Sequence, residues 1–394
     1  MRILFVAMPD SIHTARWISQ IADQGWDIFL FPVFIARSGP DLRNLTVFES
    51  FIPRPRVKEN HVRSIWWTIP FFLADFILSR IRGIKTNYFT TRALAIVVRW
   101  LRPDAVHSLE IQHAGYMTLD AKNILSKKFP IWIVTNWGSD IYLFERLAEH
   151  RPKIEAVLAN CDYYSCECQR DVMLARDLGF KGITLPVVPD AGGMELGKVS
   201  MLKSTTPAAS RRMIVLKGYQ NWAGRALVGL QAMRYCADLL QDYTLAIYMA
   251  SPDVLVSAEL FSQDTKIPVQ VISSVPHDEM LRLYSRSRIY IGLSISDGIS
   301  TSLLEAMAMG AFPIQSCTAC ADEWFADGQS GFIVPPEDPH AIAEALRRAL
   351  TDDLLVDRAA EINAQTIAQR LDNSVIKPQV IKMYEDIYNA RRNK

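Results

Sequence analysis

Short apolar runs alternate with helical patterns along most of this chain, and this alternation is the feature that most constrains its fold. Near the N-terminus, "RILFVAM" (2–8) is followed by "RWISQIADQGW" (16–26) and then by "DIFLFPV" (27–33). The same rhythm returns in the apolar runs at 104–109, 129–137 and 162–168. Buried strands that alternate with helices predict a parallel sheet covered by helices on both faces.

The rhythm stops once, between residues 189 and 210, and then restarts. This segment is rich in Gly, Ser, Thr and Pro and shows no period, so we predict a linker. After it, strand and helix patterns alternate again up to "KPQVIKMYEDIYNARR" (377–392), which predicts a final helix. The 394 residues are enough for two α/β domains. We place these domains at 1–195 and 205–373, with a C-terminal helix in 374–394 that packs back on the first.

Composition removes several classes of function. A hydrophobic content of 49% excludes wholesale disorder, and a net charge of +1 gives no bulk attraction to nucleic acid. "MRILFVAMPD" is typical of a first strand rather than a signal peptide, so we expect a cytoplasmic protein. Cys317 and Cys320 form a C-x-x-C, but no second Cys or His pair at zinc spacing accompanies them. We therefore expect loop and core thiols and no metal.

One stretch departs from the α/β pattern. Residues 61–84 are strongly apolar and aromatic, and the run is too short for an ordinary membrane span. Between 53 and 103 the chain carries ten Lys or Arg residues against two acids. Basic residues around Trp66 and Trp67 suit a surface that lies in a membrane interface, so 61–102 is a predicted peripheral membrane contact. The alternative is ordinary helices whose Arg stems cover apolar surface.

The stretch "SISDGISTSLLEAMAMGAFPI" (294–314) is the strongest candidate for chemistry. Asp297 follows a buried strand, at the edge of an open sheet where ligands bind. Gly298, Ile299, Ser300 and Thr301 lead into a helix, whose unsatisfied N–H groups suit a phosphate. Glu305 lies in apolar surroundings and needs a partner, such as a pair of sugar hydroxyls. Alternatively, Asp297 is a helix cap and Glu305 a helix-start acid.

A second candidate is "LKGYQNWAGRAL" (216–227). A strand ends at Lys217, Gly218 follows, and Arg225 lies at the start of a helix. Two cations with this placement can clamp a diphosphate, and the alternative is that both are ordinary surface residues.

The remaining candidates lie in the first half. "MPDSIHTARW" lacks the G-x-G-x-x-G fingerprint of dinucleotide binding, but Ser11 and His13 could face the crevice. "NWGSDIYLF" places Asp140, with Gly138 and Ser139, at another strand end. His107 and His113 are similar candidates, although a lone His is usually structural.

These motifs together resemble the retaining glycosyltransferases of family 4, also called group 1. Asp297 and Glu305 match the acid-x7-Glu spacing of that family, with Asp in place of the more usual first Glu. The segments "AMAMGAFPIQS", "DGQSGFIVPPEDPHAIAEAL", "GSDIY" and "SIHTARWI" also resemble family segments. The resemblance covers both halves and is strongest at 290–346. It implies the GT-B architecture, with two Rossmann-like domains that face each other across a cleft.

The resemblance also implies roles for residues. Glu305 would hold the ribose of a sugar nucleotide, and Asp297 with the backbone of 298–300 would meet the donor sugar and its phosphate. Lys217 and Arg225 resemble the basic pair of the family on the diphosphate, with a shifted spacing, and Glu323 would lie near the next loop. Trp137 stands where many relatives carry His before "GSD".

The implied function is a metal-independent, hexosyltransferase-type transfer with retention. The donor would be a nucleotide-diphosphate sugar and the acceptor a lipid-linked or cell-surface glycan intermediate, as in polysaccharide biosynthesis at the inner face of the cell membrane. No cofactor is implied. The alternatives are a sugar-nucleotide epimerase or hydrolase of the same architecture, and a binding protein that has lost activity.

Overall fold

The chain divides into two compact units in the computed structural model. Unit 1 comprises Met1–Gly192 with Ile376–Lys394, and unit 2 comprises Gly193–Val375. The structure describes residues 1–53, 55, 58–83, 86–126 and 129–392. Ile84 and Lys85 of the predicted membrane contact, and Asn393 and Lys394 of the predicted C-terminal segment, lie outside the described residues.

Unit 1 is built on an eight-stranded parallel sheet in the order β4-β3-β2-β1-β5-β6-β7-β8. Its strands are β1 (Arg2–Ala7), β2 (Asp27–Pro32), β3 (Thr46–Phe48), β4 (Arg63–Ile65), β5 (Ala105–Leu109), β6 (Ile131–Thr135), β7 (Tyr163–Ser165) and β8 (Ile183–Thr184). Its helices are α1 (Ile12–Ser19), α2 (Ile69–Arg82), α3 (Tyr88–Leu101), α4 (Tyr116–Leu125), α5 (Ser139–Tyr142), α6 (Arg151–Asn160) and α7 (Gln169–Asp177). The strand order reverses between β1 and β5, which makes their carboxyl ends the switch point of the sheet.

Both faces of this sheet are buried, which explains why its strands read as continuous apolar runs. In β1, Leu4 and Val6 face a core formed with α3, α4, α6 and α7. Ile3 and Phe5 face the opposite core, which includes residues of α1 and of the C-terminal helix α15 (Asn373–Arg392). The predicted doubly covered parallel sheet is confirmed.

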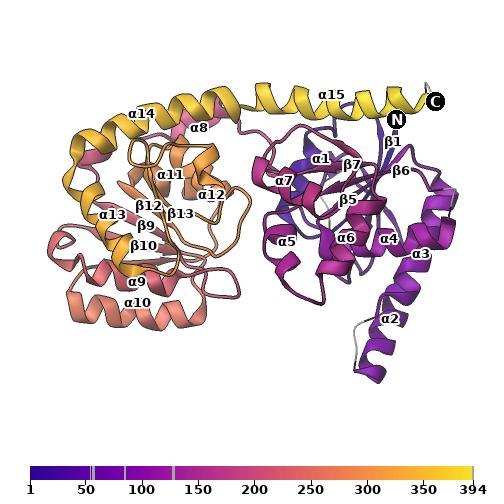
Figure 1. Cartoon of the computed structure of the whole chain (residues 1–394), viewed down its shortest axis with the longest axis horizontal. Coiled ribbons are helices and arrows are strands. Elements are labelled where there is room, and N and C mark those ends of the chain that lie inside the picture. The colour runs from indigo at the N-terminus through magenta and orange to yellow at the C-terminus, as the bar shows by residue number, and fades with distance from the viewer. Residues whose placement is uncertain (54, 56–57, 84–85, 127–128, 393–394) are drawn as a thin grey trace. The chain divides into compact units, whose positions relative to one another are not determined.

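The C-terminal helix returns to unit 1, as predicted, and a buried polar network fastens it there (Figure 1). The Tyr384 hydroxyl of α15 accepts a hydrogen bond from Trp17 Nε1 at 2.9 Å and lies 2.6 Å from His107 Nδ1. His107 Nε2 lies 2.6 Å from the Thr135 hydroxyl. Burial lowers the pKa of His107 to about 3, so this imidazole is neutral. His107, a candidate site residue, therefore has a structural role.

Unit 2 carries a six-stranded parallel sheet in the order β11-β10-β9-β12-β13-β14. Its strands are β9 (Met213–Lys217), β10 (Thr244–Tyr248), β11 (Val269–Ile272), β12 (Ile289–Gly292), β13 (Phe312–Ser316) and β14 (Phe332–Val334). Its helices are α8 (Leu196–Leu202), α9 (Ala226–Arg234), α10 (Pro252–Thr265), α11 (His277–Arg286), α12 (Thr301–Ala308), α13 (Pro339–Thr351) and α14 (Asp353–Arg370).

The sheet of unit 2 is also covered on both faces. In β9, Ile214 and Leu216 face a core that includes residues of α9, α10, α13 and α14. Val215 faces the opposite core, with residues of α8, α11 and α12. This packing holds β9 and its neighbour β12 in place. The residues that follow both strands form the candidate site.

The predicted linker 189–210 is wrong as an unstructured segment. It contains α8 and a short 3-10 helix, Ala208–Ser210. Val199 of α8 is buried in the core next to α11, so tertiary packing orders a stretch whose composition favours a loop. The first helix also begins earlier than the pattern 16–26 indicates, because the Ser11 hydroxyl accepts a hydrogen bond from the His13 N–H and caps α1.

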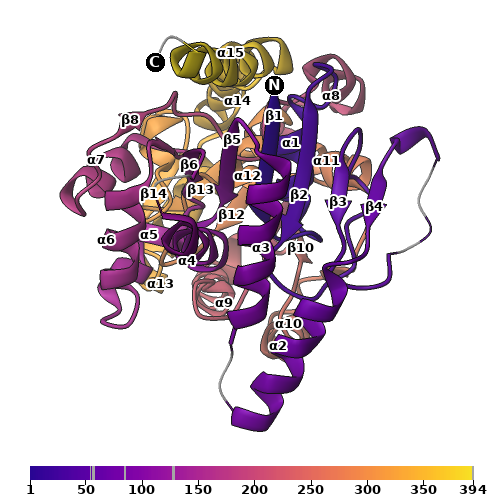
Figure 2. The same cartoon turned by 90° about the vertical axis from the view of Figure 1, so that its right-hand side faces the viewer.

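The apolar stretch around residue 70 forms α2, which extends away from the sheet of unit 1 (Figure 2). Only Phe72 and Asp75 of this helix are buried. Asp75 interrupts the apolar run because it caps the next helix: its carboxylate accepts hydrogen bonds from Phe89 N at 3.1 Å and from Thr90 N and Oγ1, both at 2.7 Å. Among the described residues, no helix has the length and apolar character needed to cross a membrane.

Candidate functional site

Three of the predicted residues meet at the carboxyl edge of the unit 2 sheet. Lys217 ends β9, and its neighbour β12 leads through residues 293–300 into α12. The Lys217 ammonium lies 3.4 Å from the Ser300 hydroxyl and 3.9 Å from Asp297 Oδ2. The Lys217 side chain is only 19% exposed. A cation, a carboxylate and a helix N-terminus are therefore brought together at this edge of the sheet.

Asp297 does not cap α12. The N-cap residue is Ser300, and Asp297 Oδ1 instead accepts a hydrogen bond from the N–H of Gly298 at 3.0 Å. Ile299 is buried in the core, so only its backbone can meet a ligand, and Thr301 is half-buried as the first residue of α12. The Ser300 side chain makes no capping hydrogen bond to α12. The alternative reading of Asp297 as a helix cap is wrong.

Glu305 lies in the second turn of α12 and is 6% exposed, so it is not an acid of the helix start. Its Oε1 lies 2.7 Å from His277 Nε2. The sequence predicted that this carboxylate needs a partner but did not identify His277. The available signal was "VPHDEM", in which Pro276 precedes the first residue of α11 and places the imidazole at a helix start.

Arg225 is placed differently from Lys217. Its backbone N–H donates to the Leu293 carbonyl at 3.0 Å, which fixes residues 219–225 against the strand exit that leads to Asp297. Its guanidinium donates to the Gly224 carbonyl at 2.9 Å and to Glu337 Oε1 at 2.8 Å. These contacts give Arg225 a role in holding its own loop, and its role on a diphosphate stays a prediction.

Close packing explains why residue 218 is glycine, without any need to leave space for a ligand. A Cβ on Gly218 would lie 2.8 Å from the Ala250 Cα and from the Tyr248 carbonyl oxygen. The chain after β9 therefore presses directly on the end of β10. A side chain at this position would force the backbone next to Lys217 or the end of β10 to shift, so we expect the glycine to support the site indirectly.

A layer of tyrosines lies at the edge of the sheet where this site forms. The Tyr284 ring of α11 lies 5.9 Å from the rings of both Tyr248 and Tyr290, which come from β10 and β12. Burial raises the pKa of the Tyr290 hydroxyl far above its ordinary value. The three phenols are therefore neutral at physiological pH, and their rings pack edge to face.

In unit 1, Ser11 and His13 lie at the start of α1, directly after β1. The His13 ring lies 5.7 Å from the ring of Trp137, which follows β6. Trp137 therefore occupies the switch-point side of the sheet together with His13. Ligand binding by Ser11 and His13 stays a prediction.

Asp140 joins two loops of unit 1. Its Oδ2 accepts hydrogen bonds from the backbone N–H groups of Ile111 and Trp137, both at 2.9 Å. Burial, and then the charge of Glu110, raise the pKa of Asp140 well above its ordinary value. Ligand binding by Asp140 stays a prediction, because these bonds already give it a structural role.

Sequence reasoning missed Glu110, which follows β5 at the switch point. Its backbone has φ 86° and ψ 153°, a conformation that non-glycine residues rarely adopt, and a π-helix, Ile111–Gly115, follows it. Its buried carboxylate lies 3.1 Å from His113 Nδ1, so His113 is held by Glu110. A strained backbone carries no sequence signal when the residue is not glycine.

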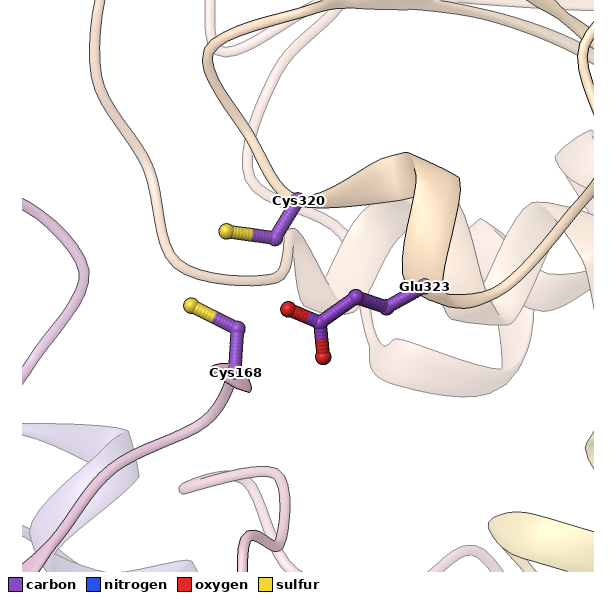
Figure 3. A group of neighbouring side chains, drawn as sticks. All are labelled: Cys168, Cys320 and Glu323. Carbon is purple, nitrogen blue, oxygen red and sulfur yellow. The ribbon is translucent and has the colours of Figure 1, made fainter. Parts of the chain in front are cut away.

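The two cysteines of the C-x-x-C differ in environment. Cys317 is exposed and Cys320 is buried. Figure 3 shows Cys320 just before the short 3-10 helix Ala321–Glu323 and Glu323 at its end. The third side chain that the figure labels, Cys168, belongs to unit 1.

Similarity to solved structures extends over nearly the whole chain. Sucrose-phosphate synthase from Thermosynechococcus elongatus is 16% identical with a TM-score of 0.71, and the alignment covers 99% of this chain and 100% of that one. Anabaena HepE in complex with UDP and glucose is 14% identical with a TM-score of 0.68, and the alignment covers 98% of this chain and 99% of that one. The two α/β units and the returning helix have the GT-B fold.

The sequence of unit 2 matches a particular protein family. Residues 256–366 match the family "Glycosyl transferases group 1", so the chain carries a glycosyltransferase group 1 domain. Asp297 and Glu305 lie within the matched residues. Phosphatidyl-myo-inositol mannosyltransferase from Mycobacterium leprae is 34% identical over 85 residues. This match covers 22% of this chain and 22% of that protein, so it describes about a fifth of either.

Proposed function

We propose that this protein is a retaining glycosyltransferase that moves a sugar from a nucleotide-diphosphate donor to an acceptor hydroxyl. Unit 2 binds the donor and unit 1 lies on the acceptor side. The observation that carries the proposal is the placement of the Lys217 ammonium beside Asp297 and Ser300, at the start of the helix that carries Glu305. This cluster lies within, or against, the residues that match the group 1 family.

The site residues divide by the part of the donor that they meet. The Glu305 carboxylate accepts hydrogen bonds from the ribose hydroxyls, and Asp297 meets the donor sugar. The diphosphate is held by positive charge and by N–H groups, from Lys217, Arg225, Gly218, Gly298, Ile299, Ser300 and Thr301. In unit 1, Ser11, His13 and Asp140 are proposed as further substrate-binding residues.

The chemistry of transfer explains why a cation belongs at the start of α12. As the bond between the sugar and the leaving diphosphate breaks, positive charge develops on the sugar ring and negative charge on the diphosphate oxygens. A preorganised ammonium and helix N–H groups stabilise that negative charge at the moment it forms. Lys217 and α12 supply both, so the proposed mechanism needs no metal ion. Retention of the anomeric configuration is carried over from the family resemblance.

Two similar proteins support the substrate class. The HepE structure contains UDP and glucose, and the mycobacterial relative is by name a phosphatidyl-myo-inositol mannosyltransferase. We therefore propose a nucleoside-diphosphate hexose as the donor. A lipid-linked or cell-surface glycan intermediate is the proposed acceptor.

The surface of α2 supports an acceptor in a membrane. Leu73, Phe76, Ile77 and Ile81 are between 42% and 77% exposed, and Trp66, Trp67 and Trp100 are also exposed. Arg80 and Arg82 lie in the last turn of α2, and the Arg80 guanidinium packs over the Phe76 ring. An exposed apolar helix with arginines suits the interface of a bilayer that contains anionic lipids. We propose that residues 61–102 bind the inner face of the cell membrane peripherally.

Vesicle sedimentation tests this contact. Replacement of Ile77 and Ile81 with Ser should abolish binding to vesicles of phosphatidylglycerol and phosphatidylcholine. The matched control replaces Val256 and Leu260 of α10, which are 62% and 50% exposed but lie beside acidic residues, and should leave binding unchanged. Equal loss in both pairs, or no loss in either, would remove the membrane proposal.

Turnover tests the activity. The protein is incubated with UDP-, GDP- and ADP-hexoses, with and without phosphatidylinositol vesicles or a total lipid extract of bacterial membranes, and nucleoside diphosphate release is followed. Release that requires lipid and disappears in Glu305→Ala supports the transferase. Release or epimerisation without lipid favours the sugar-nucleotide epimerase or hydrolase. Nucleotide binding without turnover favours a binding protein.

A further inference from the structure

The partner of Glu305 is a feature that the proposed function does not use. His277 is the first residue of α11, and its Nε2 lies 2.7 Å from Glu305 Oε1 on α12. The two side chains differ sharply in exposure, at 46% for His277 and 8% for Glu305. A nearly buried carboxylate is therefore bound by an imidazole that solvent and ligands can reach.

Both members of the pair stand on rigid elements. Leu281 and Tyr284 of α11 are buried in the same core as Leu304 of α12. The Tyr284 ring is fixed by edge contacts with Tyr248 and Tyr290. Since neither helix can shift without disturbing this core, the separation of His277 and Glu305 is set by the fold. A carboxylate held in this way presents its remaining lone pairs in a fixed direction.

The hydrogen bond has a chemical consequence for ligand binding. An imidazole that donates from Nε2 occupies one lone pair of Oε1. The carboxylate keeps further lone pairs on Oε1 and Oε2, enough to accept from two hydroxyls at once. A vicinal diol places two O–H donors at the spacing of the two oxygens of one carboxylate. Loss of His277 removes the hydrogen bond that orients Oε1, and the two acceptors are then less well aligned with a diol.

We propose that His277 is a positioning residue that makes the nucleotide site specific for ribose over 2′-deoxyribose. His277 holds Glu305 so that both ribose hydroxyls are accepted together, and a nucleotide that lacks the 2′-hydroxyl leaves part of the carboxylate unpaired. This inference rests on the proposed function, because it takes the nucleotide of the donor as the ligand of Glu305.

The test compares the dissociation constants of ribo- and 2′-deoxyribonucleotides by isothermal titration calorimetry. The probes are three matched pairs, UDP with dUDP, GDP with dGDP and ADP with dADP. A lost hydrogen bond to a charged group weakens binding by roughly 10-fold or more, so the wild-type protein should prefer the ribonucleotide of its pair by about that factor. In His277→Leu, the preference should fall to within about 3-fold.

Two further variants separate positioning from general stability. His277→Gln keeps an N–H donor and should restore most of the preference for ribose. His340→Leu is the matched control, because His340 is also exposed at a helix start, in α13, and stacks on Tyr235 instead. A purely structural role for His277 would lower the melting temperature and weaken both nucleotides of a pair equally, leaving their ratio unchanged.

The outcomes are distinguishable. Collapse of the ratio in His277→Leu, with the ratio kept in His277→Gln and His340→Leu, supports the inference. A wild-type protein that binds UDP, GDP or ADP without preferring ribose, or a preference that survives in His277→Leu, overturns it and leaves the proposed function standing. Absence of binding to all six nucleotides at millimolar concentration overturns the proposed function and this inference together.

Discussion

Replacement of Lys217 with methionine should slow sugar transfer strongly while leaving the fold intact. The ammonium lies 3.9 Å from Asp297 Oδ2, and its side chain is 19% exposed. At this separation two unit charges interact by about 1 kcal/mol in bulk water and by about 4 kcal/mol at the effective dielectric of a protein surface. A leaving diphosphate at similar distance loses this attraction in the variant, and it also meets the carboxylate of Asp297 without compensation.

Such a loss corresponds to a decrease in kcat/KM of about 5-fold at the lower limit and about 1,000-fold at the upper limit. Because Lys217 is mostly shielded from solvent, we expect a value in the upper half of that range. The assay is the initial rate of nucleoside diphosphate release with the donor that the protein binds. Methionine preserves most of the length of the side chain, so packing at the end of β9 should persist.

The control is Lys198→Met, because Lys198 is 75% exposed on α8 and forms an ion pair with its neighbour Glu195. Its rate should stay within 2-fold of the wild type, as expected of an exposed ion pair. A Lys217→Met enzyme with wild-type kcat/KM would refute the assignment of this cation to the diphosphate. An unchanged rate together with a lowered melting temperature would assign Lys217 to stability alone.

Three other predictions concern the elements that support the site. Tyr384→Phe removes the hydroxyl that bonds Trp17 and His107, and urea denaturation should show a free energy of unfolding lower by about 2 to 5 kcal/mol, since two buried polar groups lose a partner. An unchanged value would contradict this reading of the network. His107 has a folded-state pKa of about 3, below its unfolded value of 6.5. Between these two pKa values, His107 binds a proton in the unfolded chain but not in the folded chain. The free energy of unfolding should therefore decrease as pH drops from about 6.5 towards 3, by at most about 1.4 kcal/mol per pH unit. The His107→Gln variant should lack this pH-dependent decrease. If the free energy of unfolding had the same pH dependence in both proteins, His107 would not be its cause. Asp75→Ala removes the cap of α3, and urea denaturation should show a loss of about 1 to 2 kcal/mol with faster amide exchange at Thr90, whereas unchanged exchange there would dismiss the cap.

The sequence predicted the framework well because each part had a local signal. The strands β1, β2, β9 and β12 are short apolar runs in the printed sequence, and parallel sheets buried on both faces produce such runs. Asp297 and Glu305 lie where their sequence spacing predicts. Asp297 is in the loop after a strand, and Glu305 is in the helix that follows this loop. The position of Lys217 was predictable for the same reason, since it marks the end of a strand.

Other features depend on contacts between distant residues and left no local signal. α8 forms inside a Gly- and Ser-rich stretch because Val199 is buried against α11. His277 lies 28 residues from Glu305, and only the packing of two helices brings them together. Arg225 was correctly placed at a helix start, but its contacts with its own loop could not be read from the sequence.

The most direct test of the donor site is thermal unfolding of the wild-type protein and of Glu305→Ala with a panel of sugar nucleotides and free nucleotides. A ligand that binds only the folded state stabilises it by about 2.7 kcal/mol at 100 times its dissociation constant, and the melting temperature rises accordingly. We predict a clear rise with one nucleotide family for the wild type and little or none for Glu305→Ala. No rise with any nucleotide at millimolar concentration, or an equal rise in both proteins, would contradict the assignment of Glu305, and with it the proposed donor site.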